Sequence, residues 1–343
     1  MHTALLDRSV DALKAVRMHV SFSANLRSQI GQTDFGCKSE GPKCFDLGAL
    51  LGQSADVNSW RKIDHCAAIS RAYALFEEFV AQLLREYLVF LAKSYTLSDL
   101  GKDFVAKYTR GIGQILLDQD RARYENIDIA VLVADASHAL SSGGQYQIQP
   151  EAMLRTEQNL RMGELERLFG HCGLSGLQSW ISNHSAIRMF FGSSGRLSGT
   201  VESELQEIVK YRNEAAHGDV DQVLGNEVLV EITEFFEALV RGLTDFVQYE
   251  TLNRAKQLGK VKVLGVISER FKDDIVVAKI TNATLTVGDQ VYVQGNKLTM
   301  LGRIESIQLD GVPCEVATIA SVQEVGLRLG VRAKTGCELL QFL

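Results

Sequence analysis

The stretch KYRNEAAHG, residues 210–218, combines a permanently charged guanidinium, an amide and an imidazole within a few positions. Cleavage of RNA without a metal ion needs such groups. The 2′-hydroxyl must lose a proton, the 5′-oxygen must gain one, and the pentacovalent phosphorane needs compensating positive charge. Arg212 suits charge compensation because a guanidinium stays charged and can bind two phosphate oxygens at once. His217 suits proton transfer because the reference pKa of an imidazole is about 6.5.

Helix geometry limits how these side chains can act together. At about 100° per residue, Asn213 and His217 lie within about 40° of each other on one helix face. Arg212 and His217 diverge by about 140° on the same arithmetic. The pair can converge only if the helix ends near His217, as Gly218 suggests, or if Arg212 reaches round the helix. The alternative is a spacing that arises by chance, with His217 merely interacting favourably with the helix dipole.

The stretch resembles the motif of the HEPN (higher eukaryotes and prokaryotes nucleotide-binding) family, in which an arginine, a polar residue that is often asparagine, and a later histidine follow one another. Upstream, ISRAYALFEEFVAQLLREY resembles the Arg- and Glu-bearing central helix of the RiboL-PSP subgroup of this family. TEQNLRMGELERLFGHCGL is similar to the segment before that subgroup's motif, so the likeness covers most of residues 60–250. It implies a helical bundle that dimerises, places the motifs of both subunits at one cleft, and cuts RNA with neither metal ion nor cofactor.

A homodimer also makes chemical sense, because one chain offers one well-placed histidine whereas the acid and base roles need two groups. Arg71 on the central helix is a further candidate for phosphate contact, although a salt bridge to Glu77, Glu78 or Asp64 explains it at least as well. Tyr211 is a candidate for stacking on an RNA base, although a tyrosine in a helix is more often part of the core.

The remaining titratable residues give weaker signals. Six cysteines are scattered without any C-x-x-C pair, which predicts reduced thiols. Cys37 and Cys44 as half of a metal site are the weaker alternative. His65 and His171 lie in helical stretches without recognisable partners and are interpreted as structural residues.

Length and charge bound the class of protein. A chain of 343 residues exceeds the usual size of one core, which predicts two domains. The net charge is −6, divided as −8 over residues 1–255 and +2 over residues 256–343. An acidic balance argues against broad non-specific binding to a nucleic-acid backbone but leaves room for a small basic cleft. The N-terminus lacks the apolar core of a signal peptide, and no apolar run reaches about 18 residues, so we expect a cytoplasmic protein without membrane contact.

Helical periodicity predicts an all-α domain over residues 1–255. The expected helices are 1–30, 58–95, 100–140, 156–169 with a stop at Gly170, 201–217 and 227–254, and the expected loop is 31–58. The helix over 58–95 has no glycine or proline, and its wide apolar band indicates a central, buried position.

The texture changes after residue 255 into short β-branched runs separated by turn residues such as Gly288–Asp289 and Asp310–Gly311. About seven short strands predict a small antiparallel barrel over residues 256–343. LTVGDQVYVQG and EVGLRLGVRAKTGCEL resemble the second domain of translational GTPases such as elongation factor Tu, which implies contact with the ribosome or tRNA. A dimerisation or protein-docking module is the alternative. No G-x4-G-K-[ST] loop is present, so the chain is no GTPase.

Two functions fit these features. The first is an endoribonuclease that acts on RNA, aimed at tRNA or the ribosome, as a toxin or an anti-phage effector with a possible antitoxin partner. The second is a HEPN module without catalytic activity that binds nucleic acid or a protein. The acidic balance of residues 1–255 favours the second function somewhat.

Overall fold

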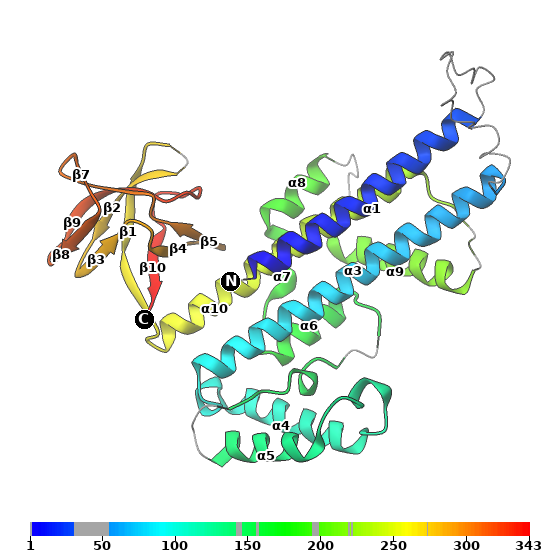
Figure 1. Cartoon of the computed structure of the whole chain (residues 1–343), viewed down its shortest axis with the longest axis horizontal. Helices are drawn as coiled ribbons and strands as arrows, with labels where there is room; N and C mark the ends of the chain where they lie inside the picture. The colour runs from blue at the N-terminus through cyan, green and yellow to red at the C-terminus, as the bar shows by residue number, and fades with distance from the viewer. Residues whose placement is uncertain are drawn as a thin grey trace, which may run out of the picture. The chain divides into compact units, whose positions relative to one another are not determined.

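The computed structural model describes residues 2–30, 55–141, 146–155, 158–193, 199–218, 220, 222–272 and 274–343. These residues divide into two compact units, 2–242 and 243–343. The first unit is helical, and the second consists of the end of the last helix and a set of antiparallel strands (Figure 1). The predicted class, all-α followed by antiparallel β, is confirmed. None of the described helices is long and apolar enough to cross a membrane.

The described helices comprise α-helices of very different lengths and, between residues 94 and 162, short 3-10 helices. They are α1 (Thr3–Ile30), α3 (Val57–Ser94), η1 (Ser98–Leu100), α4 (Lys102–Leu117), η2 (Ala122–Tyr124), α5 (Ile129–Ser141), η3 (Pro150–Ala152), α6 (Met162–His171), α7 (Leu177–Asn183), α8 (Ser185–Ser193), α9 (Val201–His217) and α10 (Asn226–Gln257).

Helix α3 is the centre of the first unit. The Asp56 carboxylate caps its N-terminus by accepting from the N–H groups of Asn58 and Ser59. Its wide apolar band is buried, with Phe76 and Leu83 fully inaccessible to solvent. Helix α1 lies along α3, and α9 packs against it as well (Figure 1). The predicted central position of this helix is confirmed, because a helix that is apolar on most of its faces must be covered on most of them.

Two predicted helices differ from those observed. The helix expected over 100–140 is interrupted between Leu117 and Ile129, where Asp128 caps α5 by accepting from the N–H groups of Ala130 and Val131. A second helix, α5, therefore begins at Ile129, in the middle of the span predicted to be one helix.

The helix expected over 156–169 begins only at Met162 and ends at His171, one residue beyond Gly170. Before it, the N–H of Leu160 is bonded to the Tyr73 hydroxyl of α3, so this N–H is held by a tertiary contact instead of a helical turn. Residues 31–54 of the expected loop, with Cys37 and Cys44, lie outside the described residues.

The second unit contains ten described strands, more than the about seven expected. They are β1 (Val261–Arg270), β2 (Ile275–Ile280), β3 (Ala283–Thr286), β4 (Gln290–Gly295), β5 (Leu298–Arg303), β6 (Ser306–Leu309), β7 (Val312–Cys314), β8 (Val316–Ile319), β9 (Gln323–Arg328) and β10 (Glu338–Phe342). Eight of them form one antiparallel sheet in the order β5-β4-β10-β1-β2-β9-β6-β7, and β3 pairs with β8.

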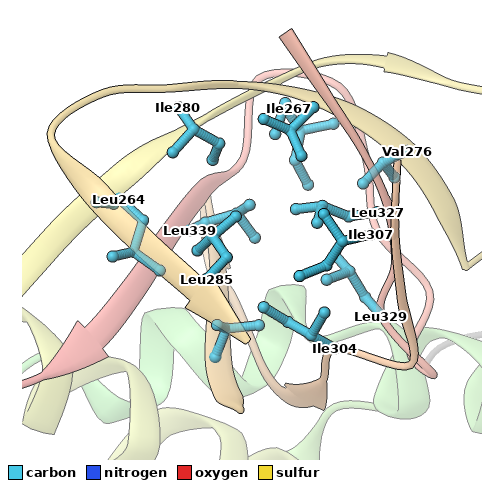
Figure 2. Packing of buried hydrophobic residues seen from close by; sticks show 14 of the residues in the cluster. Leu264, Ile267, Val276, Ile280, Leu285, Ile304, Ile307, Leu327, Leu329 and Leu339 are labelled. Carbon is cyan, nitrogen blue, oxygen red and sulfur yellow. The ribbon is translucent and has the colours of Figure 1, made fainter. Parts of the chain in front are cut away.

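The strands of both sheets contribute side chains to one core. Alternating residues such as Leu264, Ile280, Ile307 and Leu339 point inward from opposite sides and meet there (Figure 2). This inward alternation is what a period of two residues produces in a sheet with one buried face.

The end of α10 packs against these strands. Leu252 and Ala255 form a small buried cluster with Val261 of β1 and Leu340 of β10. Lys256 also forms an ion pair with Glu338, at 2.6 Å. Residues 243–257 of the helix therefore share contacts with the strands.

Candidate functional site

Helix α9 carries the Arg212–His217 stretch and has a defined start and end. Thr200 and Ser203 form a capping box at its start. At its end, Gly218 adopts a left-handed conformation with φ 74° and ψ 0°, which costs a glycine little because it has no Cβ. The predicted helix over 201–217, with Gly218 as its C-cap, is confirmed. His217 is the last helical residue, and its side chain is exposed.

The Arg212 guanidinium is held by two neighbouring side chains. Its Cζ lies 5.5 Å from the centroid of the Tyr73 ring on α3, within cation–π range. Its Nη1 donates to Oδ1 of Asn213 at 3.2 Å. The same oxygen accepts from Nδ2 of Asn159 at 3.2 Å. Asn213 shares a helix face with His217, so this hydrogen bond links the guanidinium to a residue of that face.

Tyr73 connects three parts of the site. Its ring is buried, and its hydroxyl accepts from the N–H of Leu160 at 2.6 Å while it is also hydrogen-bonded to Glu77. Burial raises the pKa of Tyr73, and the nearby Glu77 carboxylate raises it further. The hydroxyl therefore stays protonated and acts as a fixed donor to Glu77.

Glu77 lies one helical turn beyond Tyr73 on the same face of α3. Burial raises the pKa of its carboxyl group, while the charge of Arg212 and the hydrogen bond from Tyr73 oppose that rise. The half-buried Glu77 carboxyl group and the Arg212 guanidinium are therefore near enough for their charges to interact.

This arrangement leaves binding capacity for an anion. Within the described part of the chain, Nη1 is the one Arg212 nitrogen that makes a hydrogen bond, so the other donors can meet phosphate oxygens. His217 presents an accessible imidazole at the end of the same helix. The site can thus neutralise a phosphate and exchange a proton with a substrate.

Arg71 lies apart from this cluster. On helical geometry it points about 160° away from Tyr73 around α3, and it is exposed. Among the described residues its suggested salt bridges to Glu77, Glu78 and Asp64 are not formed. Asp64 is instead paired with Arg27, and Glu78 accepts from Gln82.

Tyr211 is only half-buried, next to Arg212 in the sequence. Its suggested stacking on an RNA base stays a prediction, as does the phosphate contact of Arg71.

His65 has a partner that its sequence context did not reveal. It is fully buried on α3, and its Nδ1 accepts from the N–H of Leu224, at 3.1 Å. This bond ties the segment between α9 and α10 to α3. Burial lowers the pKa of His65, so the ring is neutral, with its proton on Nε2.

Three residues of the site were not singled out from the sequence as site residues: Tyr73, Glu77 and Asn159. Tyr73 and Glu77 occur four residues apart in ISRAYALFEEF, which is the spacing of neighbours on one helix face. That spacing could have indicated the pair. Asn159 lies in a segment read as helix, and only the observed start of α6 explains why it faces Asn213.

Comparisons with known proteins give one informative match. The family model of RiboL-PSP-HEPN matches residues 49–249. The search of curated proteins gave no match. Among solved structures, the C-terminal domain of a Geobacillus thermoleovorans protein described as a U32 peptidase is 18% identical, with 23% of this chain and 98% of that chain covered and a TM-score of 0.21.

That structural likeness is too weak to carry an argument, and the expected resemblance to elongation factor Tu is not confirmed. The family match is different in kind, because it spans more than half of the chain and includes α3 and α9 with the Arg212–His217 stretch. The protein therefore belongs to the RiboL-PSP-HEPN family.

Proposed function

We propose that this protein is an endoribonuclease that cuts RNA without a metal ion, with Arg212 and His217 as its catalytic residues. The observation that carries the proposal is the way Arg212 is held. The Tyr73 ring lies over its guanidinium and Asn213 accepts a hydrogen bond from it, while His217 is exposed at the end of the same helix. A fixed cation and an accessible imidazole on one helix are the inventory that phosphoester cleavage at a ribose requires.

The reaction needs two proton transfers. One His217 accepts the proton of the 2′-hydroxyl, and the oxygen attacks the adjacent phosphorus. The His217 of a second subunit donates a proton to the departing 5′-oxygen, while Arg212 stabilises the charge of the phosphorane. The products are a 2′,3′-cyclic phosphate and a 5′-hydroxyl end. Asn213 serves as a positioning residue, because its Oδ1 holds the guanidinium.

The test is cleavage of RNA by the purified protein in EDTA, with the chemistry of the new ends determined. Arg212→Ala and His217→Ala are each expected to slow cleavage by about 100-fold or more, the usual effect of removing a charge-stabilising or proton-transfer group. Arg8→Ala on α1 and His138→Ala on α5 are exposed controls that should keep full activity. Cleavage that persists in both site variants would overturn the proposal.

The proposed mechanism uses a homodimer. Exposed apolar side chains on α1 and α3 support one: Met18, Phe22 and Ile63 are 72%, 67% and 60% exposed. Ser23 donates to Asp64 at 2.6 Å, and this bond brings the preceding residues Phe22 of α1 and Ile63 of α3 near each other. We expect Phe22→Asp to shift the protein from dimer to monomer in sedimentation experiments and to abolish cleavage. A monomeric wild-type protein that cuts RNA would contradict this.

We infer further that the enzyme acts as a toxin or anti-phage effector on tRNA or ribosome-associated RNA. The motive for this target is the similarity of the strings LTVGDQVYVQG and EVGLRLGVRAKTGCEL to a translation-factor domain, a likeness that rests on the sequence alone. Expression should arrest growth, and His217→Ala should relieve the arrest. Sequencing RNA ends after induction would identify the target, and cuts confined to messenger RNA would argue against a role at the translation apparatus. A toxin that is held inactive by an antitoxin would arrest growth only when that partner is removed.

The acidic balance of residues 1–255 favours one other candidate, a module that binds RNA or a protein without cutting. RNA that is bound by the purified protein but stays intact, together with harmless expression, would support this second function.

A further inference from the structure

A cavity of about 560 Å³ opens beside the site on the same face of α3. Its apolar wall is formed by Val80, Ala81, Leu84, Leu154, Leu160 and Leu168. Its charged groups are Glu77, Glu78, Arg85, Arg123 and Glu151. Two of the lining residues, Glu77 and Leu160, also contact Tyr73, so the cavity and the Arg212 site share a wall.

The charged groups of the cavity differ in how strongly they are engaged. Arg85 and Glu151 neutralise each other through an ion pair of 3.1 Å. Glu78 is exposed and accepts from Gln82 with one oxygen, Oε1. Arg123 is exposed, with its guanidinium 5.0 Å from the centroid of the Tyr124 ring. Carboxylate acceptors and one guanidinium donor therefore remain for a ligand.

These features fit a nucleobase better than a phosphate. Three carboxylates against two guanidinium groups make the rim acidic, which disfavours an anion. The apolar wall and the volume are typical of pockets that bury a flat ligand of modest size. An unstacked RNA base offers such a flat ligand, with donors and acceptors along its edges.

We propose that this cavity binds the base next to the cleaved phosphate and prefers guanine, an inference that rests on the ribonuclease activity proposed for Arg212 and His217. Guanine presents N–H donors on one edge, which a carboxylate such as that of Glu78 can accept together. It also presents O6 and N7 acceptors, which an arginine such as Arg123 can bind. Uracil lacks the exocyclic amino group. Glu77 belongs both to the base cavity and to the Arg212 site, because it lines the cavity and the charge of Arg212 opposes the rise of its pKa.

Binding of 5′-mononucleotides to the full-length protein, measured by calorimetry, tests this without any cleavage, because a mononucleotide has no internucleotide bond. GMP is expected to bind at least about tenfold more tightly than UMP, the discrimination that one good bidentate contact provides. Ala81→Phe, which fills the cavity, should weaken GMP binding about tenfold or more. The same change at Ala106, exposed on α4, is the matched control and should leave binding unchanged.

A second variant guards against a misfolded Ala81→Phe protein. Glu78→Gln changes one exposed atom and should reduce the preference for GMP over UMP to near unity. Equal binding of all four nucleotides, GMP binding that survives in both variants, or no binding at millimolar GMP would each overturn the inference.

The two proposals fail in different ways. GMP binding that is lost in Ala81→Phe, in a protein that leaves RNA intact, would refute the ribonuclease but keep the base site. RNA cleavage without GMP binding, and without any bias towards guanine at the cut, would refute the base site alone.

Discussion

The position of the Arg212 guanidinium depends on Tyr73 of α3 as well as on the place of Arg212 in α9. The Tyr73 ring faces the guanidinium, while the hydroxyl links the N–H of Leu160 to the Glu77 carboxylate. The ring therefore contacts the Arg212 guanidinium, and the hydroxyl holds the N–H of Leu160 and the Glu77 carboxylate. These two roles can be separated by removing one oxygen atom.

Tyr73→Phe keeps the ring and removes the hydroxyl. The N–H of Leu160 then loses its acceptor in a buried position, which should lower the free energy of unfolding by about 1–3 kcal/mol. RNA cleavage should fall, because Glu77 and the segment before α6 are no longer held. Urea denaturation and cleavage rates measure both effects.

Tyr124→Phe is the matched control. The Tyr124 hydroxyl is also buried but has no hydrogen-bond partner among the described residues. Its removal should leave stability unchanged or raise it slightly. If the two variants lose stability equally, the hydroxyl of Tyr73 has no special role.

We expect His65 to make the free energy of unfolding depend on pH. Burial lowers its pKa below the usual value of about 6.5, so the unfolded chain binds a proton more readily than the folded chain. The free energy of unfolding should be highest above about pH 6.5 and fall as the pH drops below it. His2 and His171, whose pKa values burial also lowers, contribute in the same direction.

His65→Asn should weaken this pH dependence, because an asparagine Oδ1 can accept from the N–H of Leu224 without titrating. Urea denaturation at pH 7.5 and pH 5 measures the difference. The same change at His138, exposed on α5, controls for the loss of an imidazole. Identical pH slopes for wild type and His65→Asn would show that another group causes the dependence.

At the scale of elements, α4 and η3 approach each other closely at one glycine. A Cβ on Gly111 would lie 1.8 Å from the carbonyl oxygen of Ala152, so only glycine allows this contact. The contact matters for the proposed base site, because η3 and the residues after it supply Glu151 and Leu154 to the cavity.

Gly111→Ala should therefore destabilise the helical unit by about 1–3 kcal/mol, the usual cost of overpacking, or by more if the backbone cannot shift. Gly113→Ala is the control in the same helix, because a Cβ there meets nothing within 4 Å. It should raise stability by up to about 1 kcal/mol, since alanine favours a helix. Chemical denaturation of both variants decides the matter, and equal effects would refute the close contact.

At the scale of the whole molecule, the end of α10 determines where the boundary between the helical unit and the strand unit lies. The change in sequence texture predicts a boundary after residue 255, whereas the contacts group residues 243–257 with the strands. Leu252 and Ala255 are fully buried in a cluster with Leu340. Asn253 also accepts from Gln294, at 3.0 Å.

A fragment of residues 243–343 should consequently be more stable than one of residues 256–343. Losing the burial of Leu252 alone costs about 1.5–3 kcal/mol. Thermal denaturation of the two fragments, followed by circular dichroism, gives the comparison. Equal melting temperatures would favour the boundary after residue 255.

The sequence alone predicts what depends on local pattern. The apolar periodicity of α3, the end of α9 at Gly218 and the alternation of the strands all depend on a few neighbouring residues, so the sequence predicts them without the fold. The Arg212–His217 motif belongs to this class as well, because its residues are neighbours in the chain.

Only the tertiary structure decides what depends on contacts between distant segments. Tyr73, Asn159 and Asn213 come from three separate segments, and no local pattern brings them to one guanidinium. The late start of α6 has the same origin, since the N–H of Leu160 bonds to a side chain from another helix. Spacing in the sequence indicated the pair that we propose as catalytic, whereas the packing of α9 against α3 supplies the Tyr73 ring that lies over the Arg212 guanidinium.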